Sequence, residues 1–308
     1  MIKLTSSPLG FSLIETLIAV AISISFTLIL TYSYMTIRRL YQLNQNMITM
    51  QNKAFIAQQL LSRDIRTAGF IGCERLTSSM ELHHPDNVNL TMESRLHGYS
   101  SNNLPAEMKF AAKDISPDSD VIVVEKMSND ISLLKDINSR KKYYLGQYIM
   151  ISDCANRTIF QYTQNNLIQQ LKNKSDFSSV AQIAPLEKIV FYIANTGRTT
   201  SHGVPLFALY KKDLWGVDHQ QTELVDGIEN MQILYGYQSS VTHQIIYFTA
   251  DQITHWPQVS VIKIDLLLAS LQPANFIRQT IQYMGQPLNT NDHRMRREWL
   301  IIICLREH

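Results

Sequence analysis

Residues Phe11 to Leu30 form an almost uninterrupted apolar run, and this run limits what the chain can be. A helix crosses a lipid bilayer with roughly 20 such residues, so the run predicts a membrane helix. One charge, Glu15, interrupts it. A carboxylate at the centre of a membrane helix costs roughly 2.5–3.5 kcal/mol on insertion scales, which marks a functional residue that has a partner. The sequence holds no Lys or Arg between Phe11 and Ile37, so the cation that pairs with Glu15 is not local.

Three interpretations fit residues 1–37. In the first, they are a cleaved secretory signal, with Lys3 as its basic start and Ala19-Val20-Ala21 as a small-x-small cleavage site. The position of Glu15 inside the apolar run, and the continuation of the run beyond the cleavage site, argue against this interpretation. In the second, the segment is a plain signal anchor and its charge is accidental. In the third, residues 1–10 are a leader that is removed from a membrane helix over residues 11–37.

Helical character continues past the apolar run. Apolar residues recur at spacings of three and four from Leu40 to Leu61, which is typical of one narrow stripe along a helix. No Pro or Gly occurs in residues 11–68, and Gly69 then breaks the pattern. We therefore expect one helix over residues 11–68. Its stripe is expected to pack on the chain's own globular domain, and a coiled coil with another chain is the alternative.

Residues 69–308 are expected to form a globular domain rather than a disordered segment, because the chain is 45% apolar and 18% charged. The domain is expected to be mainly β. The net charge of +2 gives no strong attraction to nucleic acid. Strand-like segments follow one another without alternating helices, which favours an antiparallel sheet. The expected strands are 120–127, 143–152, 157–163, 188–193, 206–211, 231–237, 260–269 and 299–305, with mostly loop over 80–118 and short helices at 249–252 and 273–276. The fold class is therefore α+β: a long N-terminal helix, with a transmembrane and an amphipathic half, packed on a C-terminal antiparallel β-sheet domain.

The segment Gly10-Phe11-Ser12-Leu13-Ile14-Glu15 resembles the processing site of type IV pilins and of the related secretion pseudopilins. The resemblance implies a type IV pilin-like fold, cleavage after Gly10 by a prepilin peptidase and N-methylation of Phe11. It also implies that Glu15 docks on the Phe11 amino group of a neighbouring subunit. Such an amine would supply the cation that the membrane helix lacks, and a buried carboxylate needs one.

Four further stretches resemble PilW-type minor pilins. The junction from Leu61 to Cys73 follows their pattern Leu-x-x-Asp-Ile/Leu-Arg-x-Ala-Gly-aromatic-x-Gly-Cys. The other three are Ile151–Cys154 with Ile159–Gln161, Leu224–Gln232 with Tyr235-Gly236, and Arg294, Arg296 and Arg297 with the closing run 299–306.

The resemblance to PilW-type pilins implies a disulfide between Cys73 and Cys154. The sequence alone allows three pairings among its three cysteines. Cys304 departs from the family pattern, and we expect it to be a buried apolar residue on a strand rather than a reactive one.

Other polar clusters lack the pattern of a metal-binding or catalytic site. His83 and His84 are adjacent and lack a third ligand at a zinc spacing. Asp114, Asp118 and Asp120 lack the spacing of an EF-hand calcium loop, so a solvated turn is expected there. No catalytic or phosphate-binding motif is present. We therefore expect no catalytic residue, no cofactor, no metal and no enzyme activity.

Arg294, Arg296 and Arg297 form the densest basic cluster of the sequence. Phosphate contacts with DNA need such groups. Three arginines at the start of a strand are more often a solvated edge that guards against aggregation, which is the expected role here. Nucleic acid is therefore not expected as a partner.

Together these features predict a minor pilin that acts in type IV pilus assembly or initiation and supports twitching motility, adhesion or DNA uptake. Its implied partners are other minor pilins, the major pilin, the prepilin peptidase and the inner-membrane assembly platform. It is expected to span the inner membrane once, with a cytoplasmic N-terminus and a periplasmic head, and then to enter the pilus at the cell surface. Charge counting conflicts mildly with this topology, because Lys3 precedes the helix while Arg38 and Arg39 follow it. The alternatives are a type II secretion pseudopilin and a membrane-anchored adhesin or binding module outside a filament.

Overall fold

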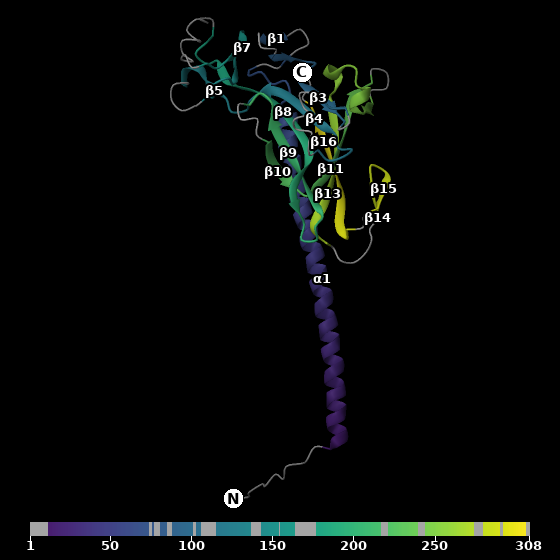
Figure 1. Cartoon of the computed structure of the whole chain (residues 1–308). Coiled ribbons are helices and arrows are strands. Elements are labelled where there is room, and N and C mark those ends of the chain that lie inside the picture. Colours follow the sequence, from purple (N-terminus) through teal and green to yellow (C-terminus); the bar gives the residue numbers. More distant parts are fainter. Residues whose placement is uncertain are drawn as a thin grey trace, which may run out of the picture. The chain divides into compact units, whose positions relative to one another are not determined.

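The computed structural model describes residues 12–73, 76, 81–84, 88–100, 103–105, 115–136, 143–153, 155–163, 177–216, 221–239, 244–273, 280–289 and 292–305. The chain divides into two compact units, Met1–Ile48 and Thr49–His308. Each unit is described by itself, and the second is called the head below. One helix, α1 (Leu13–Ile65), contributes residues to both (Figure 1).

Up to Ile37, the part of α1 in the first unit is apolar on all sides except for Glu15 and several hydroxyl groups. It contains a stretch of mean hydropathy 2.3 that none of the described residues buries, and this is the one candidate membrane span in the described part of the chain. Several hydroxyls interrupt the apolar surface, and six of the Ser and Thr hydroxyls donate to carbonyl oxygens of the same helix. Ser23 and Thr27, for example, donate to the carbonyl oxygens of Ala19 and Ser23 at 2.7 and 2.8 Å. Such internal bonds let hydroxyls lie in lipid without unpaired donors.

The larger sheet of the head has eight strands, all in antiparallel pairs. They are β3 (Leu96–Tyr99), β4 (Val121–Met127), β5 (Ser132–Leu133), β6 (Tyr148–Ser152), β7 (Arg157–Gln161), β8 (Gln182–Thr199), β9 (Pro205–Asp213) and β10 (Gln221–Asp226). The spatial order is β10-β9-β8-β4-β3, while β5 and β6 pair with the start of β8 and β7 pairs with β6. The 18-residue strand β8 therefore joins the two parts of this sheet.

The second sheet has four antiparallel strands in the order β12-β11-β13-β16. Their bounds are β11 (Ile228–Gln238), β12 (Ile245–Phe248), β13 (Val261–Pro273) and β16 (Arg294–Cys304). Two hairpins, β1 (Glu81–His84) with β2 (Val88–Thr91) and β14 (Thr280–Tyr283) with β15 (Gln286–Asn289), and three short 3₁₀ turns, η4 (Leu134–Asp136), η5 (Ala250–Gln252) and η6 (Trp256–Gln258), complete the described elements.

The head half of α1 packs on both of these sheets. Its predicted apolar stripe is buried from Met50 onward, where Ala57 and Leu61 are 0% exposed, whereas the earlier positions of the stripe are exposed or half-buried. The same core cluster takes Ile122 and Phe191 from the larger sheet and Ile301 from the second sheet. The stripe thus packs within its own chain, and the predicted α+β class, a long helix on antiparallel sheets, is confirmed.

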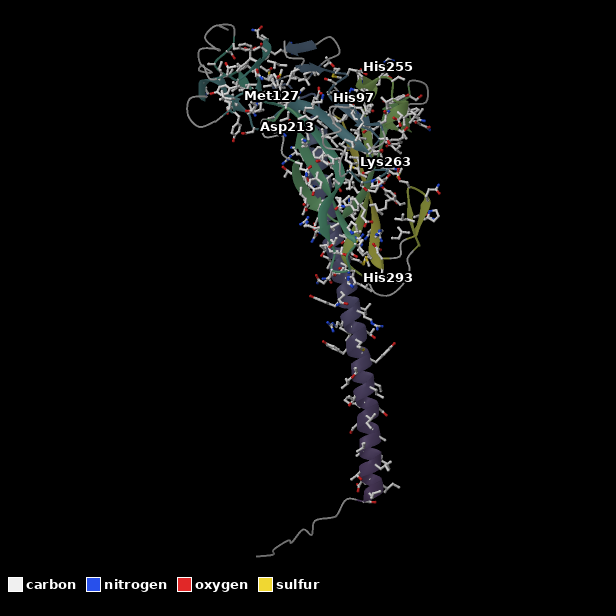
Figure 2. The ribbon with its side chains drawn as sticks, viewed as in Figure 1. His97, Met127, Asp213, His255, Lys263 and His293 are labelled. Carbon is white, nitrogen blue, oxygen red and sulfur yellow. The ribbon has the colours of Figure 1, made fainter. Side chains whose placement is uncertain are left out.

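The two sheets also contact each other directly. Tyr235 of β11 lies against β3, where a Cβ atom at Gly98 would lie 2.1 Å from the tyrosine hydroxyl oxygen. Only glycine leaves room for this approach. A smaller cluster beyond the main core contains Met127 of β4, labelled in Figure 2, together with Met150 and Leu186.

Residues 80–118 differ from the expectation of mostly loop. They contain β1, β2 and β3, each four residues long. Leu96 of β3 is opposite Val124 of β4, and the partner strand rather than local sequence makes this segment extended. The predicted strand 188–193 is likewise only the middle of β8. The short helix expected at 249–252 is η5, whereas residues 274–276 of the other lie outside the described residues.

Candidate functional site

Glu15 lies in the first turn of α1, one turn into an apolar helix surface. It is exposed, and its neighbours Leu13 and Leu17 are 82% and 63% exposed, so no described residue covers this part of the helix. Arg38 is the first basic residue after it in the sequence, about 35 Å further along the helix at the usual rise per residue. The carboxylate therefore has no cation within the membrane-length part of α1. Gly10 and Phe11 lie outside the described residues.

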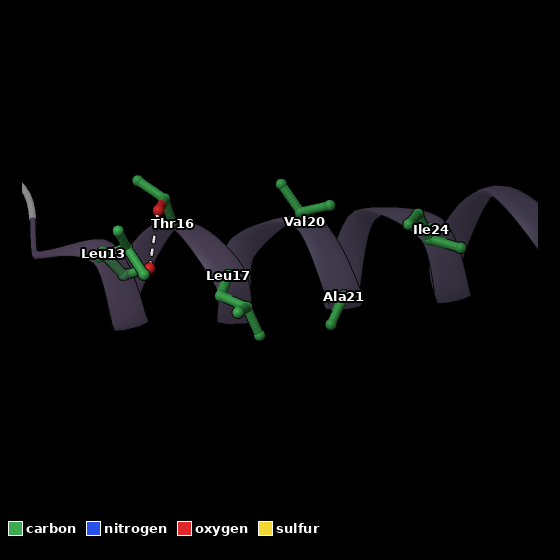
Figure 3. A pocket seen from close by; sticks show the side chains of 6 residues that line it. All are labelled: Leu13, Thr16, Leu17, Val20, Ala21 and Ile24. Atoms are coloured by element: carbon green, nitrogen blue, oxygen red, sulfur yellow. Dashed lines mark hydrogen bonds between the residues drawn. The ribbon is translucent and has the colours of Figure 1, made fainter.

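A shallow, open groove runs along the same part of the helix (Figure 3). It is lined by Leu13, Thr16, Leu17, Val20, Ala21 and Ile24. Its one polar side chain, Thr16, donates its hydroxyl to the Leu13 carbonyl oxygen at 2.8 Å. With that hydroxyl engaged, the groove offers an apolar surface to lipid or to another helix.

A second charged group lies at the other end of α1, inside the head. Asp64 is 2% exposed, and its carboxylate oxygens lie 2.9 Å from the Nζ atoms of both Lys126 on β4 and Lys211 on β9. Burial by itself raises the pKa of the Asp64 carboxyl, but the two ammonium groups more than offset this, and the pKa lies below its usual value. These three residues are called the Asp64 cluster below. In the sequence, Asp64 stands out only as part of the junction motif, and no local pattern indicates that it pairs with the two lysines.

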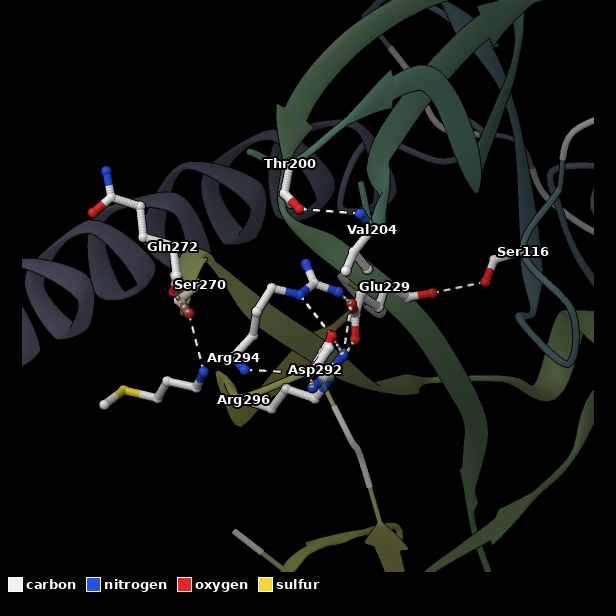
Figure 4. Close-up of polar contacts among 10 residues, drawn as sticks. Ser116, Thr200, Val204, Glu229, Ser270, Gln272, Asp292, Arg294 and Arg296 are labelled. Atoms are coloured by element: carbon white, nitrogen blue, oxygen red, sulfur yellow. Dashed lines mark hydrogen bonds and ion pairs between the residues drawn. The ribbon is translucent and has the colours of Figure 1, made fainter. Parts of the chain in front are cut away.

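Two of the predicted arginines form a third charged cluster, with acidic partners on other elements (Figure 4). Arg294 donates to Asp292 at 2.8 Å and to Glu229 of β11. Arg296 donates to Asp292 and to Glu229, in both cases at 2.6 Å. The guanidinium groups hold the pKa of the Asp292 carboxyl below its usual range, against the effect of burial. The carboxylates in turn raise the pKa of Arg296, again against burial.

The expected solvated edge is therefore wrong for these two arginines. Arg294 and Arg296 are 5% and 9% exposed, and only Arg297 faces solvent. Glu229 of β11 and the arginines of β16 are far apart in the sequence. Their pairing depends on the register of β13, which lies between β11 and β16. Both guanidinium groups are instead buried and paired with the carboxylates of Asp292 and Glu229.

The cysteines are placed only in part. Cys73 follows the junction turn and is exposed, and Cys154 lies outside the described residues, so the predicted pairing stays a prediction. Cys304 is exposed on β16, which corrects the expectation of a buried side chain. Side chains alternate along the strand, with Ile301 and Ile303 facing the core and Cys304 on the opposite face.

The candidate metal residues are engaged by the head itself or lie outside the described part. His83 and His84 belong to β1, but their side chains are not described, and neither is Asp114. The Asp118 carbonyl oxygen accepts a bond from Gln232. Asp120 accepts the Ile233 N–H at 2.9 Å, and burial raises the pKa of its carboxyl to about 6. Within the described ranges, no three His, Cys, Asp or Glu side chains gather as a metal site would require.

Comparison with known proteins identifies a family over part of the chain. Residues 190–306, from the middle of β8 past the end of β16, match the model of the family type IV pilus-assembly protein W. The match includes Glu229, Arg294 and Arg296, and it excludes α1. None of the curated protein sequences matches.

Among solved structures, a type IV-like pilin from Thermus thermophilus aligns with a TM-score of 0.36 and 13% identity, over 83% of this chain and 95% of that one. The family match confirms that this chain resembles PilW-type pilins, and it supports a pilus-related role.

Proposed function

We propose that the protein is a minor pilin that acts in the assembly or initiation of a type IV pilus. The observation that carries the proposal is Glu15, a carboxylate on a helix of membrane length that has no Lys or Arg between Phe11 and Ile37. A carboxylate in that position requires a partner from another molecule. The family match over residues 190–306 supports the pilus context but not this particular role.

The partner that fits is the amino group that cleavage after Gly10 creates on Phe11 of a neighbouring subunit. In this proposal a prepilin peptidase cleaves the leader, residues 1–10, and methylates the new N-terminus. The subunit is held in the inner membrane by its helix, with its head in the periplasm, before it enters the pilus. Its partners are other minor pilins, the major pilin and the assembly platform, and the pilus supports twitching, adhesion or DNA uptake.

The test compares two neighbouring substitutions in cells that depend on this subunit. Glu15→Gln removes the charge at nearly constant volume, and we expect it to abolish incorporation into pili while the protein still accumulates in the membrane. Thr16→Val is the matched control, since it removes a hydroxyl that bonds only to its own helix, and it should assemble normally. Incorporation is measured by immunoblotting of sheared pili against the membrane fraction.

N-terminal sequencing of the mature protein completes this test. A start at methylated Phe11 is expected. Normal assembly of the Glu15→Gln variant, or a mature N-terminus elsewhere, would contradict the proposal and would favour an anchored binding module outside the filament.

We also infer a Cys73–Cys154 disulfide in the oxidising periplasm. A Cβ atom at Gly72 would lie 2.9 Å from the Cβ of Ser152, so the residue before Cys73 lies against the end of β6, two residues before Cys154. The bond would close a loop of about 80 residues, for which chain entropy gives roughly 4–5 kcal/mol at most. Non-reducing peptide mapping should recover the Cys73–Cys154 peptide, with Cys304 alkylated; a bridge to Cys304 would overturn the pairing.

A further inference from the structure

The Asp64 cluster joins α1 to two strands of the larger sheet at once. Lys126 of β4 binds one carboxylate oxygen and Lys211 of β9 binds the other, and these two strands flank β8 on either side. The Lys126 ammonium also donates to Thr67 at 3.0 Å, just after the end of the helix, and its side chain is 1% exposed. The last turn of α1 is thus held over the middle of the sheet by a buried carboxylate, one buried ammonium group and one partly exposed ammonium group.

The Asp64 ion pairs depend on direction and distance, whereas the apolar contacts of the same helix do not. The stripe consists largely of small or flexible side chains, including Ala54, Ala57 and Met50. Apolar burial is non-directional, and rearrangements that conserve volume cost little. An ion pair removed from water is favourable only in good geometry, and a displaced partner is left charged and buried. A shift of α1 by one turn, about 5.4 Å, would separate Asp64 from both lysines.

We propose that Asp64 is a positioning residue that fixes the axial register of the helix on the head, through its two-sided contact with Lys126 and Lys211. The apolar stripe supplies most of the attraction, and the Asp64 cluster selects one arrangement among those that the stripe permits. The proposal concerns the head alone and does not depend on the protein being a pilin. In a filament, a single register would give every copy the same head position on its helix.

The head contains a natural reporter of this register on its other sheet. The Trp299 indole N–H of β16 donates to the Gln58 side-chain oxygen of α1 at 3.1 Å. Gln58 precedes Asp64 by six residues on the same helix and faces a different sheet. Any axial shift or rotation of the helix therefore changes the Trp299 hydrogen bond, although Trp299 and Asp64 make no contact that would link them directly.

The experiment uses the full-length protein in detergent micelles, labelled with ¹⁵N-tryptophan. Its three tryptophans give three indole signals, and Trp299→Phe assigns the one of interest. Gln58→Ala shows where that signal moves when the bond is lost. In Asp64→Asn we expect the wild-type Trp299 signal to be lost, either by a shift toward the Gln58→Ala position or by splitting into several signals.

The matched control is Glu125→Gln. Glu125 is also buried, at 3% exposure, and its carboxylate lies 2.8 Å from the Lys188 Nζ, but Lys188 belongs to β8 and not to α1. Glu125→Gln should keep the wild-type Trp299 signal. If both variants lose it, general destabilisation moves the reporter and the proposal is wrong. If Asp64→Asn keeps the wild-type signal, the proposal is wrong as well.

A double variant covers the case in which Asp64→Asn does not fold. Asp64→Leu with Lys126→Met replaces the buried pair by apolar side chains, a change that often preserves stability. A folded double variant that still lacks the wild-type Trp299 signal supports the role in register. A folded double variant with one wild-type signal shows that the ion pair only stabilises the head, and this overturns the proposal.

Discussion

Two acidic residues on the same helix have opposite environments. Glu15, near the start of α1, is exposed on an apolar surface and has no Lys or Arg between Phe11 and Ile37 to pair with. Asp64, at the end of α1, is buried and has two ammonium groups at 2.9 Å. Both carboxylates are costly unless paired, so the difference lies in where the pairing cation comes from.

The comparison separates folding from assembly. The head completes the Asp64 cluster from its own strands, so that charge belongs to the folded state of one chain. The apolar half of α1 holds no Lys or Arg to pair with Glu15, and in our proposal another molecule supplies that partner. An acidic residue therefore orders the fold of its own chain at one end of the helix (Asp64). In our proposal, an acidic residue at the other end docks the subunit on its neighbour (Glu15).

The largest effect on stability is expected from Lys126→Met. It removes the more deeply buried cation from Asp64 and Thr67 and leaves the buried carboxylate with Lys211 and, at 3.6 Å, with Arg63. Breaking a buried pair costs about 3–5 kcal/mol, and we expect a loss at the lower end because Lys211 remains. Urea unfolding of the full chain in detergent, followed by tryptophan fluorescence, measures it.

Lys211→Met is the control for this prediction. The Lys211 side chain is 26% exposed, so water partly screens its pair with Asp64, and we expect a loss of about 1 kcal/mol. Equal losses in the two variants would show that burial does not distinguish the two cations.

A smaller, pH-dependent effect is expected at Asp213, a half-buried carboxylate (labelled in Figure 2) that takes part in none of the described ion pairs. Its oxygen accepts only the backbone N–H groups of Lys188 and Trp215, at 3.0 and 3.1 Å, among the described hydrogen bonds. Burial raises the pKa of Asp213 to about 6. The folded pKa lies above the unfolded value, so this residue lowers stability as pH rises from about 4 to 6 and above.

Asp213→Asn keeps an oxygen acceptor and removes the charge. We expect the variant to melt at a higher temperature than the wild type at about pH 7.5 and at the same temperature near pH 4. Asp64 has the opposite sign: its pKa is lowered, so its contribution is present at neutral pH and is lost as pH falls below the usual aspartate range. A gain for Asp213→Asn at the lower pH only would contradict this assignment.

The smallest effect on head stability is expected from Glu15→Gln. No described residue packs on Glu15, so the free energy of unfolding of the head should change by less than about 0.5 kcal/mol. Unfolding by urea beside the wild type measures this. A loss comparable to that of Lys126→Met would mean that Glu15 has a partner within its own chain, and the contrast between the two carboxylates would disappear.

The amino-acid sequence alone determined the features that depend on local order. The apolar run with one charge, the stripe of α1 and most strands are visible because side-chain periodicity is a property of neighbouring residues. The absence of Lys and Arg between Phe11 and Ile37 is equally local, and it carries the proposal for Glu15. Strands β1, β2 and β3 were missed, since four-residue segments owe their conformation to the strands that they pair with.

Only the tertiary structure decided which charges meet. Asp64 is separated from Lys126 and Lys211 by 62 and 147 positions, and Glu229 from Arg296 by 67. No periodicity connects residues so far apart, and strand order and register bring them together. For this reason Arg294 and Arg296, which were predicted to mark a solvated edge, form buried ion pairs instead. Cys304 was exposed because a strand alternates its faces, and the packing of Ile301 and Ile303 on the core fixed which face it occupies.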